Sequence, residues 1–362
     1  MRSRYVSDFH FPFFISVLFL CIVGVFNLYS ASHQSAHPQW LYQIYWLFMG
    51  LGVAGLMTFL DYRIFERLGY PLYFINLFLL LLVMLIGPRI YGAHRWIDLG
   101  FMRLQPSELM KISLVLVLAQ YFHADRNVGG YRLVGLIRPM MLLGMAAALV
   151  VIEPDLGTTL LLCFIAGSIF MFVKIKWQSL LILAVIGALS APLAYHFALK
   201  DYQKDRVKTF LNPSRDPRGK GYHALQSMIA VGSGKFYGKG HMKGSQTQLA
   251  FLPEQHTDFV FSVFAEEHGF VGVTLFLIIY IVMIFMGLDI SKHARDKFGA
   301  ILGFGITSIF FWQAFINIGM VIGVLPVVGI TLPFFSYGGS SLIISMMGVG
   351  VLLSIHLRRF IF

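Results

Sequence analysis

The sequence predicts an all-α membrane protein that crosses the bilayer many times, and three observations carry this prediction. Of the 362 residues, 57% are hydrophobic and 12% are charged, whereas about 25% are charged in a typical soluble domain. The mean hydropathy is +0.74. Apolar stretches of roughly 20 residues, the length that spans a bilayer as a helix, recur along the chain. This composition excludes a soluble enzyme, a disordered protein and a disulfide scaffold, because the charged residues are too few to cover a soluble surface.

Ten stretches match the length of a membrane span, or nearly so. We expect helices over residues 11–31, 41–60, 70–88, 107–123, 135–152, 155–173, 178–198, 258–287, 299–325 and 335–357. Two of these, 107–123 and 155–173, are short or mixed, so nine or eleven spans stay open. The first stretch follows two arginines, as in a signal peptide, but its apolar run is too long for one, and we interpret it as an uncleaved anchor. The whole chain, 1–362, is then a single membrane domain.

The distribution of basic residues predicts that both termini lie in the cytoplasm. With the N-terminus inside, Lys and Arg gather in the inside segments, and the short outside loops hold only Arg89, Arg95 and Arg103. We attribute the net charge of +11 to contacts with anionic lipid headgroups rather than with nucleic acid. The two cysteines, Cys21 and Cys163, lie in apolar runs, which leaves no disulfide framework and no Cys-based metal site.

The segment 199–257 is the loop with enough residues to fold outside the membrane, and we place it on the outer side. A loop of this length is largely exempt from the charge rule. Tyr222, Leu225, Met228 and Ile229 recur at helical spacing, which predicts a short helix on the membrane surface. The loop leads directly into the span that begins at residue 258.

Ionisable residues at or inside the spans are candidate functional residues, because an unpaired charge in the bilayer is costly. Glu108 and Lys111 are three residues apart on one helix face, so they form either a structural ion pair or part of a polar cavity that contacts an anionic ligand. Glu153 and Asp155 lie in a tight outside turn, where carboxylates either cap a helix or help to bind a divalent cation.

Three further acids lie at the start of the eighth span. Asp258 stands where the wet loop meets the membrane, so it either caps the helix or acts as a base on a lipid headgroup. Glu266 and Glu267 lie about 12 Å deeper at 1.5 Å per residue, and we expect them to be paired internally, with Lys111 or His268. No nucleotide, zinc or CxxC motif of soluble enzymes is present. The sequence therefore indicates chemistry on a lipid-borne or polar substrate at the outer leaflet.

Seven motifs, in this order along the chain, resemble those of the SEDS family (shape, elongation, division and sporulation). The resemblance covers about residues 10–358, and it is closer to the rod-shape RodA branch than to the FtsW division branch. One departure is Glu153, where many relatives carry Gln or another residue. The motifs are Gln105–Glu108, Glu153–Thr158, His256–Phe259, Ala265–Gly269, Asn317–Met320, Leu325–Gly329 and Leu332–Ser340.

The resemblance implies a peptidoglycan glycosyltransferase with ten transmembrane helices. Such an enzyme polymerises lipid II into glycan strands at the outer leaflet of the cytoplasmic (inner) membrane during cell elongation. It works with a class B penicillin-binding protein that crosslinks the product and with the elongation machinery. An α-linked donor that gives a β-linked product requires one inversion, so one base suffices. A divalent cation, Mg²⁺ or Mn²⁺, is expected to assist the leaving pyrophosphate, and no organic cofactor is expected.

The family's essential aspartate maps onto Asp258, which we predict to be the catalytic base. Asp258 and Asp155 are the candidate metal ligands. The predicted substrate and cavity residues are Glu108, Lys111, Asp155, Arg206, Glu266 and Glu267. Three alternatives stay open: a lipid II flippase, a division-specific polymerase of the FtsW type, and a non-catalytic scaffold for the penicillin-binding protein. Buried charges that crowd toward the outer side favour outer-leaflet chemistry over the flippase.

Overall fold

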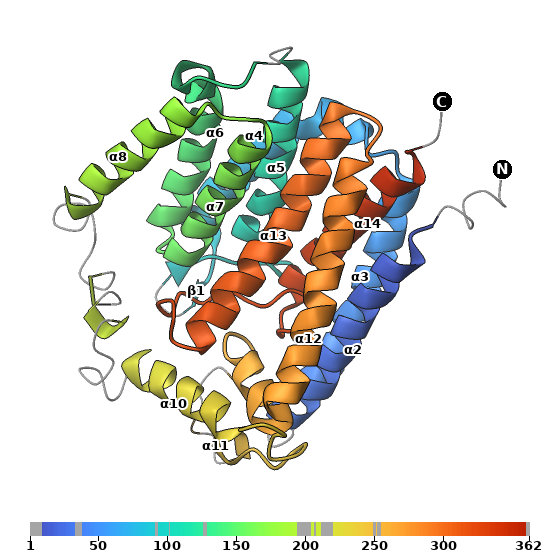
Figure 1. Ribbon diagram of the computed structural model, residues 1–362, viewed down its shortest axis with the longest axis vertical. Helices are drawn as coiled ribbons and strands as arrows, with labels where there is room; N and C mark the ends of the chain where they lie inside the picture. The colour runs from blue at the N-terminus through green and yellow to red at the C-terminus, as the bar shows by residue number, and fades with distance from the viewer. Residues whose placement is uncertain are drawn as a thin grey trace.

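A computed structural model describes residues 9–32, 38–90, 93–100, 102–125, 129–193, 204–205, 208–210, 220–248, 251 and 255–359. Each of the ten predicted spans coincides with a helix (Figure 1). These helices are α2 (Phe11–Ser32), α3 (Gln39–Phe59), α4 (Ile64–Ile86), α5 (Pro106–Ala124), α6 (Leu133–Ile152), α7 (Leu156–Phe172), α8 (Trp177–Leu193), α12 (Val260–Lys292), α13 (Lys297–Val321) and α14 (Gly339–Leu357). The predicted all-α class is confirmed.

The remaining elements are short and connect the long helices. Two small antiparallel hairpins lie between α4 and α5, where no strand was predicted: β1 (Arg89–Ile90) pairs with β2 (Ala93–His94), and β3 (Ile97–Asp98) pairs with β4 (Arg103–Leu104). The long loop contains α10 (Lys220–Ser233) and α11 (Ser245–Gln248). The predicted loop helix is therefore present as α10.

Seven helices within the described residues are long and apolar enough to cross a membrane: α2, α3, α4, α6, α12, α13 and α14. α7 and α8 have 17 residues each, and α5 carries the charged residues Glu108 and Lys111. The outer surface of the bundle is itself apolar, and Phe48, Phe59 and Leu85 are 70%, 77% and 82% exposed. A soluble surface does not carry so much exposed apolar side chain, so the chain is a multi-pass membrane protein. The number of ten spans stays a prediction.

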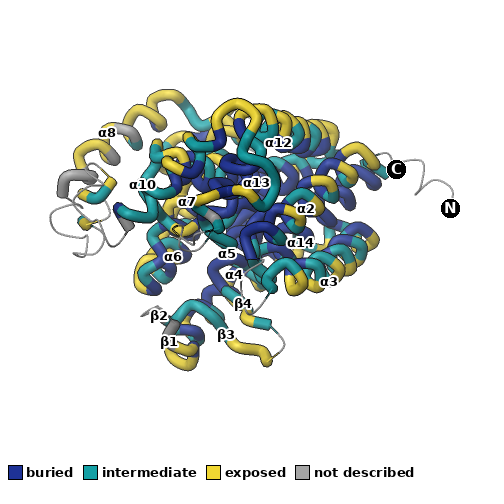
Figure 2. The backbone as a smooth tube through the Cα atoms, turned by 90° about the horizontal axis from the view of Figure 1, so that it is seen from below, coloured by how far each residue is buried: buried dark blue, intermediate teal, exposed yellow. Residues whose placement is uncertain are grey.

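The core of the bundle lies around α5, α13 and α14 (Figure 2). α5 packs against α4, α7 and α13, while α14 packs against α3. α12 lies between α13 and α2. Buried residues occupy this centre, and exposed residues mark the outer helices. The polar side chains of α5 and α13 are therefore enclosed by protein, which is the arrangement that intramembrane polar groups require.

The two ends of the bundle differ. α2 begins and α14 ends at one end, while α10 and α11 lie at the opposite end (Figure 1). The starts of α5 and α12 and the turn between α6 and α7 also lie at the end with α10, since the helices alternate in direction. α10 does not stand apart from the bundle, because the Ser227 hydroxyl donates to the Val321 carbonyl (2.7 Å) and contacts the Ser262 hydroxyl (2.8 Å). The predicted site residues that the structure describes therefore share the end that carries the long loop.

The end of α13 and the start of α14 differ from the predicted residues. α13 stops at Val321 instead of residue 325, because Gly323 adopts a left-handed φ of 77° and the amides of Val324 and Leu325 turn back to the Gly319 carbonyl. α14 begins at Gly339 instead of residue 335. The chain between the two helices is an irregular segment at the loop end of the bundle, and this segment borders the site.

Candidate functional site

Asp258 lies directly before α12, at the junction that the sequence predicted. Asp258 is half-buried. The N-cap position of α12 is the next residue, Phe259, which makes no side-chain cap bond. The Asn317 side chain of α13 donates its Nδ2 hydrogens to the Asp258 carbonyl oxygen (3.0 Å) and to the Ile330 carbonyl oxygen (2.7 Å). Asn317 is fully buried. The backbone of Asp258 is thus fixed by α13.

The segment Val328–Ile330 lies beside Asp258 and continues to the α6–α7 turn. A methyl group placed on Gly329 would lie 3.2 Å from Asp258 Oδ2, and Gly329 adopts a left-handed φ of 77° that favours glycine. On the other side, a methyl group placed on Gly157 in the first turn of α7 would lie 2.8 Å from the Val328 carbonyl oxygen. One segment therefore borders both Asp258 and the helix that Asp155 caps.

Asp155 is the N-cap of α7. Its carboxylate accepts hydrogen bonds from the Thr158 amide (3.2 Å) and the Thr158 hydroxyl (2.8 Å), and the residue is buried. The capping interpretation of this turn is therefore the one that the geometry matches. Each Asp155 oxygen accepts one of these bonds and has a further lone pair, so Asp155 as a metal ligand stays a prediction.

Glu153 is a buried carboxylate in the same turn. Neither of its oxygens has a hydrogen-bond partner within the described part of the chain. Burial raises the pKa of Glu153 to about 8, and the nearby charge of Asp155 adds to this rise. The Arg95 guanidinium donates to the Glu153 carbonyl (3.0 Å) and to the Pro154 carbonyl, so it braces the turn through the backbone. The sequence prediction gave Arg95 no role. Its presence in a short outside loop, where the charge rule predicts few basic residues, is the signal that could have identified it.

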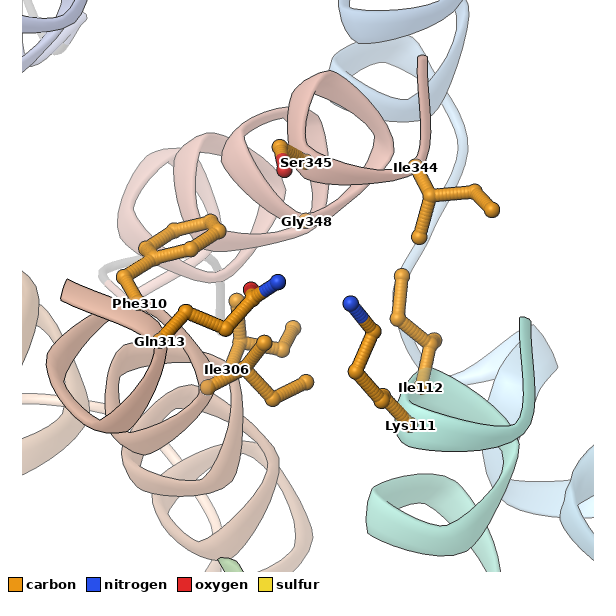
Figure 3. Close-up of a pocket in the computed structure, with 9 residues that line it drawn as sticks. Lys111, Ile112, Ile306, Phe310, Gln313, Ile344, Ser345 and Gly348 are labelled. Carbon is orange, nitrogen blue, oxygen red and sulfur yellow. The ribbon is translucent and has the colours of Figure 1, made fainter. Parts of the chain in front are cut away.

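The predicted Glu108–Lys111 ion pair is present within α5. Lys111 Nζ lies 2.6 Å from Glu108 Oε2, and only 1% of Lys111 is exposed. Lys111 also points into a small cavity between α5, α13 and α14, opposite Gln313 (Figure 3). Gln313 could not be recognised from the sequence, because one amide in a long apolar helix carries no spacing signal.

Glu266 and Glu267 are paired, mainly with side chains of the long loop, and of the two predicted partners His268 interacts with Glu267 through its charge. Glu266 contacts Lys239 (2.7 Å), and Glu267 contacts His241 (3.2 Å). The prediction of Lys111 as a partner is wrong, since Lys111 is bonded to Glu108 within its own helix.

The loop reaches these two acids because α12 is kinked at Gly269, whose φ is 63°. The backbone around Gly238 packs directly against the kink, where a side chain on either glycine would collide with the facing backbone. The Lys239 and Gly240 amides donate to the carbonyls of Glu266 and Glu267 (3.0 Å each). The two acids therefore anchor the loop to α12. The sequence did not reveal this because a kink inside an apolar helix has no clear pattern.

The remaining predicted residue and the metal site are less defined. Arg206 lies outside the described residues. Among the residues that the structure describes, no group of three or more His, Cys, Asp or Glu side chains could hold a metal ion. A cation bound at this end would therefore need oxygen ligands from its substrate, as Mg²⁺ commonly takes from phosphates.

A family model described as "Cell cycle protein", for FtsW, RodA and SpoVE sequences, matches residues 10–360. The Escherichia coli K12 protein "Peptidoglycan glycosyltransferase MrdB" is 42% identical over 312 residues, which cover 86% of this chain and 84% of that protein. "Probable peptidoglycan glycosyltransferase FtsW" of Trichlorobacter lovleyi is 36% identical and covers 97% of this chain and 93% of its own.

Two solved structures share the fold along almost their whole length. The first, from "Structural coordination of polymerization and crosslinking by a peptidoglycan synthase complex", has a TM-score of 0.85 and 33% identity, and it covers 98% of this chain and 99% of its own. The second, the rod shape determining protein RodA of Thermus thermophilus, has a TM-score of 0.72 and 29% identity, with 97% and 98% covered. The arrangement of helices described above is therefore that of known proteins.

Proposed function

Since the chain belongs to the cell cycle protein family of FtsW, RodA and SpoVE, we propose that it polymerises lipid II into glycan strands during cell elongation. Its curated relatives are named peptidoglycan glycosyltransferases, which confirms the predicted enzyme class. One observation in the structure supports the proposed site above all: Asp258 stands at the junction of loop and membrane with its backbone fixed by Asn317.

In the proposed reaction, the Asp258 carboxylate accepts the proton of the acceptor sugar's hydroxyl as that oxygen attacks the donor's anomeric carbon. The bond from that carbon to the undecaprenyl pyrophosphate breaks, and the configuration inverts once. An ordinary carboxylate is a weak base for a sugar hydroxyl, so its contribution lies mainly in orienting the hydroxyl and stabilising charge as the proton leaves. The bonds from Asn317 support this role, because they hold the backbone that carries the base.

The departing pyrophosphate requires positive charge. Lys111 is buried and bonded to Glu108, so we assign the pair to the wall of the substrate cavity rather than to direct contact with phosphate. The basic residues of the long loop, Arg206 among them, are the proposed contacts. A divalent cation fits the residues present only if the substrate supplies most of its ligands, and Asp258 is then the protein oxygen that would hold it. When bound, it would supply charge neutralisation for the leaving group.

We further propose that the reaction takes place at the outer leaflet of the cytoplasmic membrane, with both termini in the cytoplasm. Two features support this orientation: the start of α2 and the end of α14 lie opposite the long loop, and the short outside loops carry few basic residues. The proposed partner is an elongation-specific class B penicillin-binding protein. The structural likeness to a chain of a peptidoglycan synthase complex that coordinates polymerization and crosslinking supports this partner.

The test uses the purified protein with its penicillin-binding partner, lipid II and Mg²⁺, and glycan polymers are resolved on a gel. Wild-type protein should make polymer. Asp258→Asn keeps the size of the side chain but cannot accept a proton, so it should fold normally and make none. Asp98→Asn, which changes an exposed carboxylate in β3, is the matched control and should retain activity. Normal polymerisation by Asp258→Asn would remove Asp258 from the mechanism.

A further inference from the structure

Gln313 is a buried amide that the structure leaves without a partner. It lies on α13 with 1% of its surface exposed. Neither Oε1 nor Nε2 has a hydrogen-bond partner among the described residues. Native proteins leave few such groups unsatisfied, because a buried polar atom that loses water without gaining a hydrogen bond destabilises the fold. An orphaned amide in the centre of a membrane bundle therefore indicates a bound polar molecule.

The space beside Gln313 has the size and polarity for one water molecule. The cavity measures about 10 Å³ and is lined by Lys111 from α5, Gln313 from α13 and Ser345 from α14, with apolar side chains around them. The Lys111 ammonium and the Gln313 amide point toward each other across it (Figure 3). A volume of this size admits about one water and excludes a phosphate or a sugar, and a buried water is stable when it has two to four polar partners.

We propose that this cavity holds one water molecule bound to Lys111 Nζ, the Gln313 amide and the Ser345 hydroxyl, and that Gln313 is thereby a positioning residue for the Glu108–Lys111 pair. An ammonium has three donors, and within the described chain Glu108 accepts one of them. The water accepts a second hydrogen bond from the ammonium and donates its own hydrogen bonds to the Gln313 amide or the Ser345 hydroxyl. Either orientation of the amide provides a suitable partner.

The position of Gln313 gives this water a functional consequence, which rests on the proposed function. Gln313 and Asn317 are four residues apart on α13, so they lie on the same face of the helix. Asn317 fixes the backbone of Asp258, and Gln313 holds the ion pair of α5 through the water. One helix face thus supports both the candidate base and the wall of the substrate cavity.

The first arm of the test measures thermal unfolding and requires no activity. Gln313→Leu is made in the wild type and in the Glu108→Gln/Lys111→Met background, where the cation is absent. The water should couple Gln313 to Lys111, so the leucine should shift the unfolding midpoint at least about 2 °C further downward in the wild type than in the double variant. An equal shift in both backgrounds would overturn the proposal. Ser308→Ala, whose hydroxyl bonds to its own helix at Phe304, is the control and should show equal shifts.

The second arm measures polymer formation. Gln313→Leu should lower it about tenfold, whereas Gln313→Asn keeps an amide, leaves room for water and should stay within about threefold of wild type. Ser308→Ala should have no effect. Unchanged activity of Gln313→Leu would overturn the positioning role. A wild type that makes no polymer would instead contradict the proposed function, and the unfolding arm would still decide whether the water couples Gln313 to Lys111.

Discussion

Two glutamate–lysine pairs of nearly equal length, each with a buried glutamate, lie in different surroundings. Glu108 and Lys111 are 2.6 Å apart within α5, and Lys111 faces a small cavity. Glu266 of α12 and Lys239 of the long loop are 2.7 Å apart. The Glu266 carboxylate also accepts from the Ser233 and Ser245 hydroxyls (3.3 Å each) and from the Gln246 amide (3.1 Å).

The difference shows that burial of a charge does not by itself identify a functional residue. The donors around Glu266 come from the end of α10 and from the loop segment that follows it, so their combined effect is to hold that loop on the kink of α12. Lys111, by contrast, is bonded to Glu108 and faces a cavity whose wall is otherwise apolar apart from Gln313 and Ser345. In the first arrangement the carboxylate is bonded to donors of the protein, which favours a structural role. The second leaves donors directed at a space, which is the property expected beside a bound molecule.

The largest effect is expected from Lys111→Met. This change leaves Glu108 as an unpaired buried carboxylate, and breaking a buried pair from one side costs about 3–5 kcal/mol. The variant should be poorly expressed and have a strongly lowered unfolding midpoint, measured by membrane immunoblot and thermal scanning. Adding Glu108→Gln removes the unpaired charge and should restore expression to near wild type, while polymer formation should stay low. Recovery of activity in this double variant would assign the pair a purely structural role.

A smaller loss is expected from Glu266→Gln. The amide removes the charge that Lys239 neutralises, and hydrogen bonds to charged groups contribute about 1.5–3 kcal/mol. Because the Lys239 side chain is 29% exposed, its ammonium reaches water in the variant, which limits the cost to about 2 kcal/mol. Limited proteolysis should cut the loop between residues 234 and 248 faster, while polymer formation per folded molecule stays close to wild type.

The control for Glu266→Gln is Asp289→Asn on the same helix, which breaks an exposed pair with His293 and should change neither measurement. Loss of activity in folded Glu266→Gln would contradict the structural assignment and place this acid in the substrate cavity.

Much of the fold could be predicted because length and hydropathy are local properties of the sequence. The ten apolar stretches and the helix near Tyr222 needed no tertiary information. The predicted end of α13 and the predicted start of α14 were misplaced. Leu325 and Phe335 are apolar, and an apolar residue alone does not distinguish an irregular segment from a helix. The hairpins before α5 were missed because strands of two residues have no detectable period.

The site was predictable where partners lie close in sequence and not where they lie far apart. The Glu108–Lys111 pair was predictable because its members are three positions apart on one helix face. The partner of Glu266 is 27 residues away in a loop, and the amide that fixes Asp258 is 59 residues away. Spacing alone does not reveal such contacts, since they depend on how the helices pack.

Asn317→Leu tests the support of Asp258 directly. The change removes both donors and leaves the carbonyls of Asp258 and Ile330 without them, which should cost about 2 kcal/mol. Polymer formation should decrease about tenfold, because the base loses its fixed position. The control is Asn27→Leu, since Asn27 is an equally buried asparagine that donates to the Val260 carbonyl from α2. Both variants should lose stability, but only Asn317→Leu should lose activity per folded molecule, and equal activities would contradict the positioning of Asp258.

The effect of Glu153→Gln on stability should depend on pH, because it follows the protonation of the Glu153 carboxyl. In the folded protein the pKa of Glu153 is raised to about 8 by burial and by the charge of Asp155, whereas in the unfolded chain it is the ordinary 4.5. Between these values the folded state holds one more proton, so this group lowers stability as the pH rises, by at most about 1.4 kcal/mol per pH unit.

Glutamine has no proton to lose, so the variant should match wild type below pH 4.5 and become more stable from there to pH 8. From pH 5 to pH 6 the stability difference between variant and wild type should grow by about 1 kcal/mol. The measurement is the unfolding midpoint in detergent at fixed ionic strength. Asp98→Asn, which changes an exposed carboxylate, should give a constant offset over the same range. A variant that is less stable than wild type at pH 7 would mean that ionised Glu153 has a cationic partner, and the turn would then resemble the Glu266 site rather than the cavity beside Lys111.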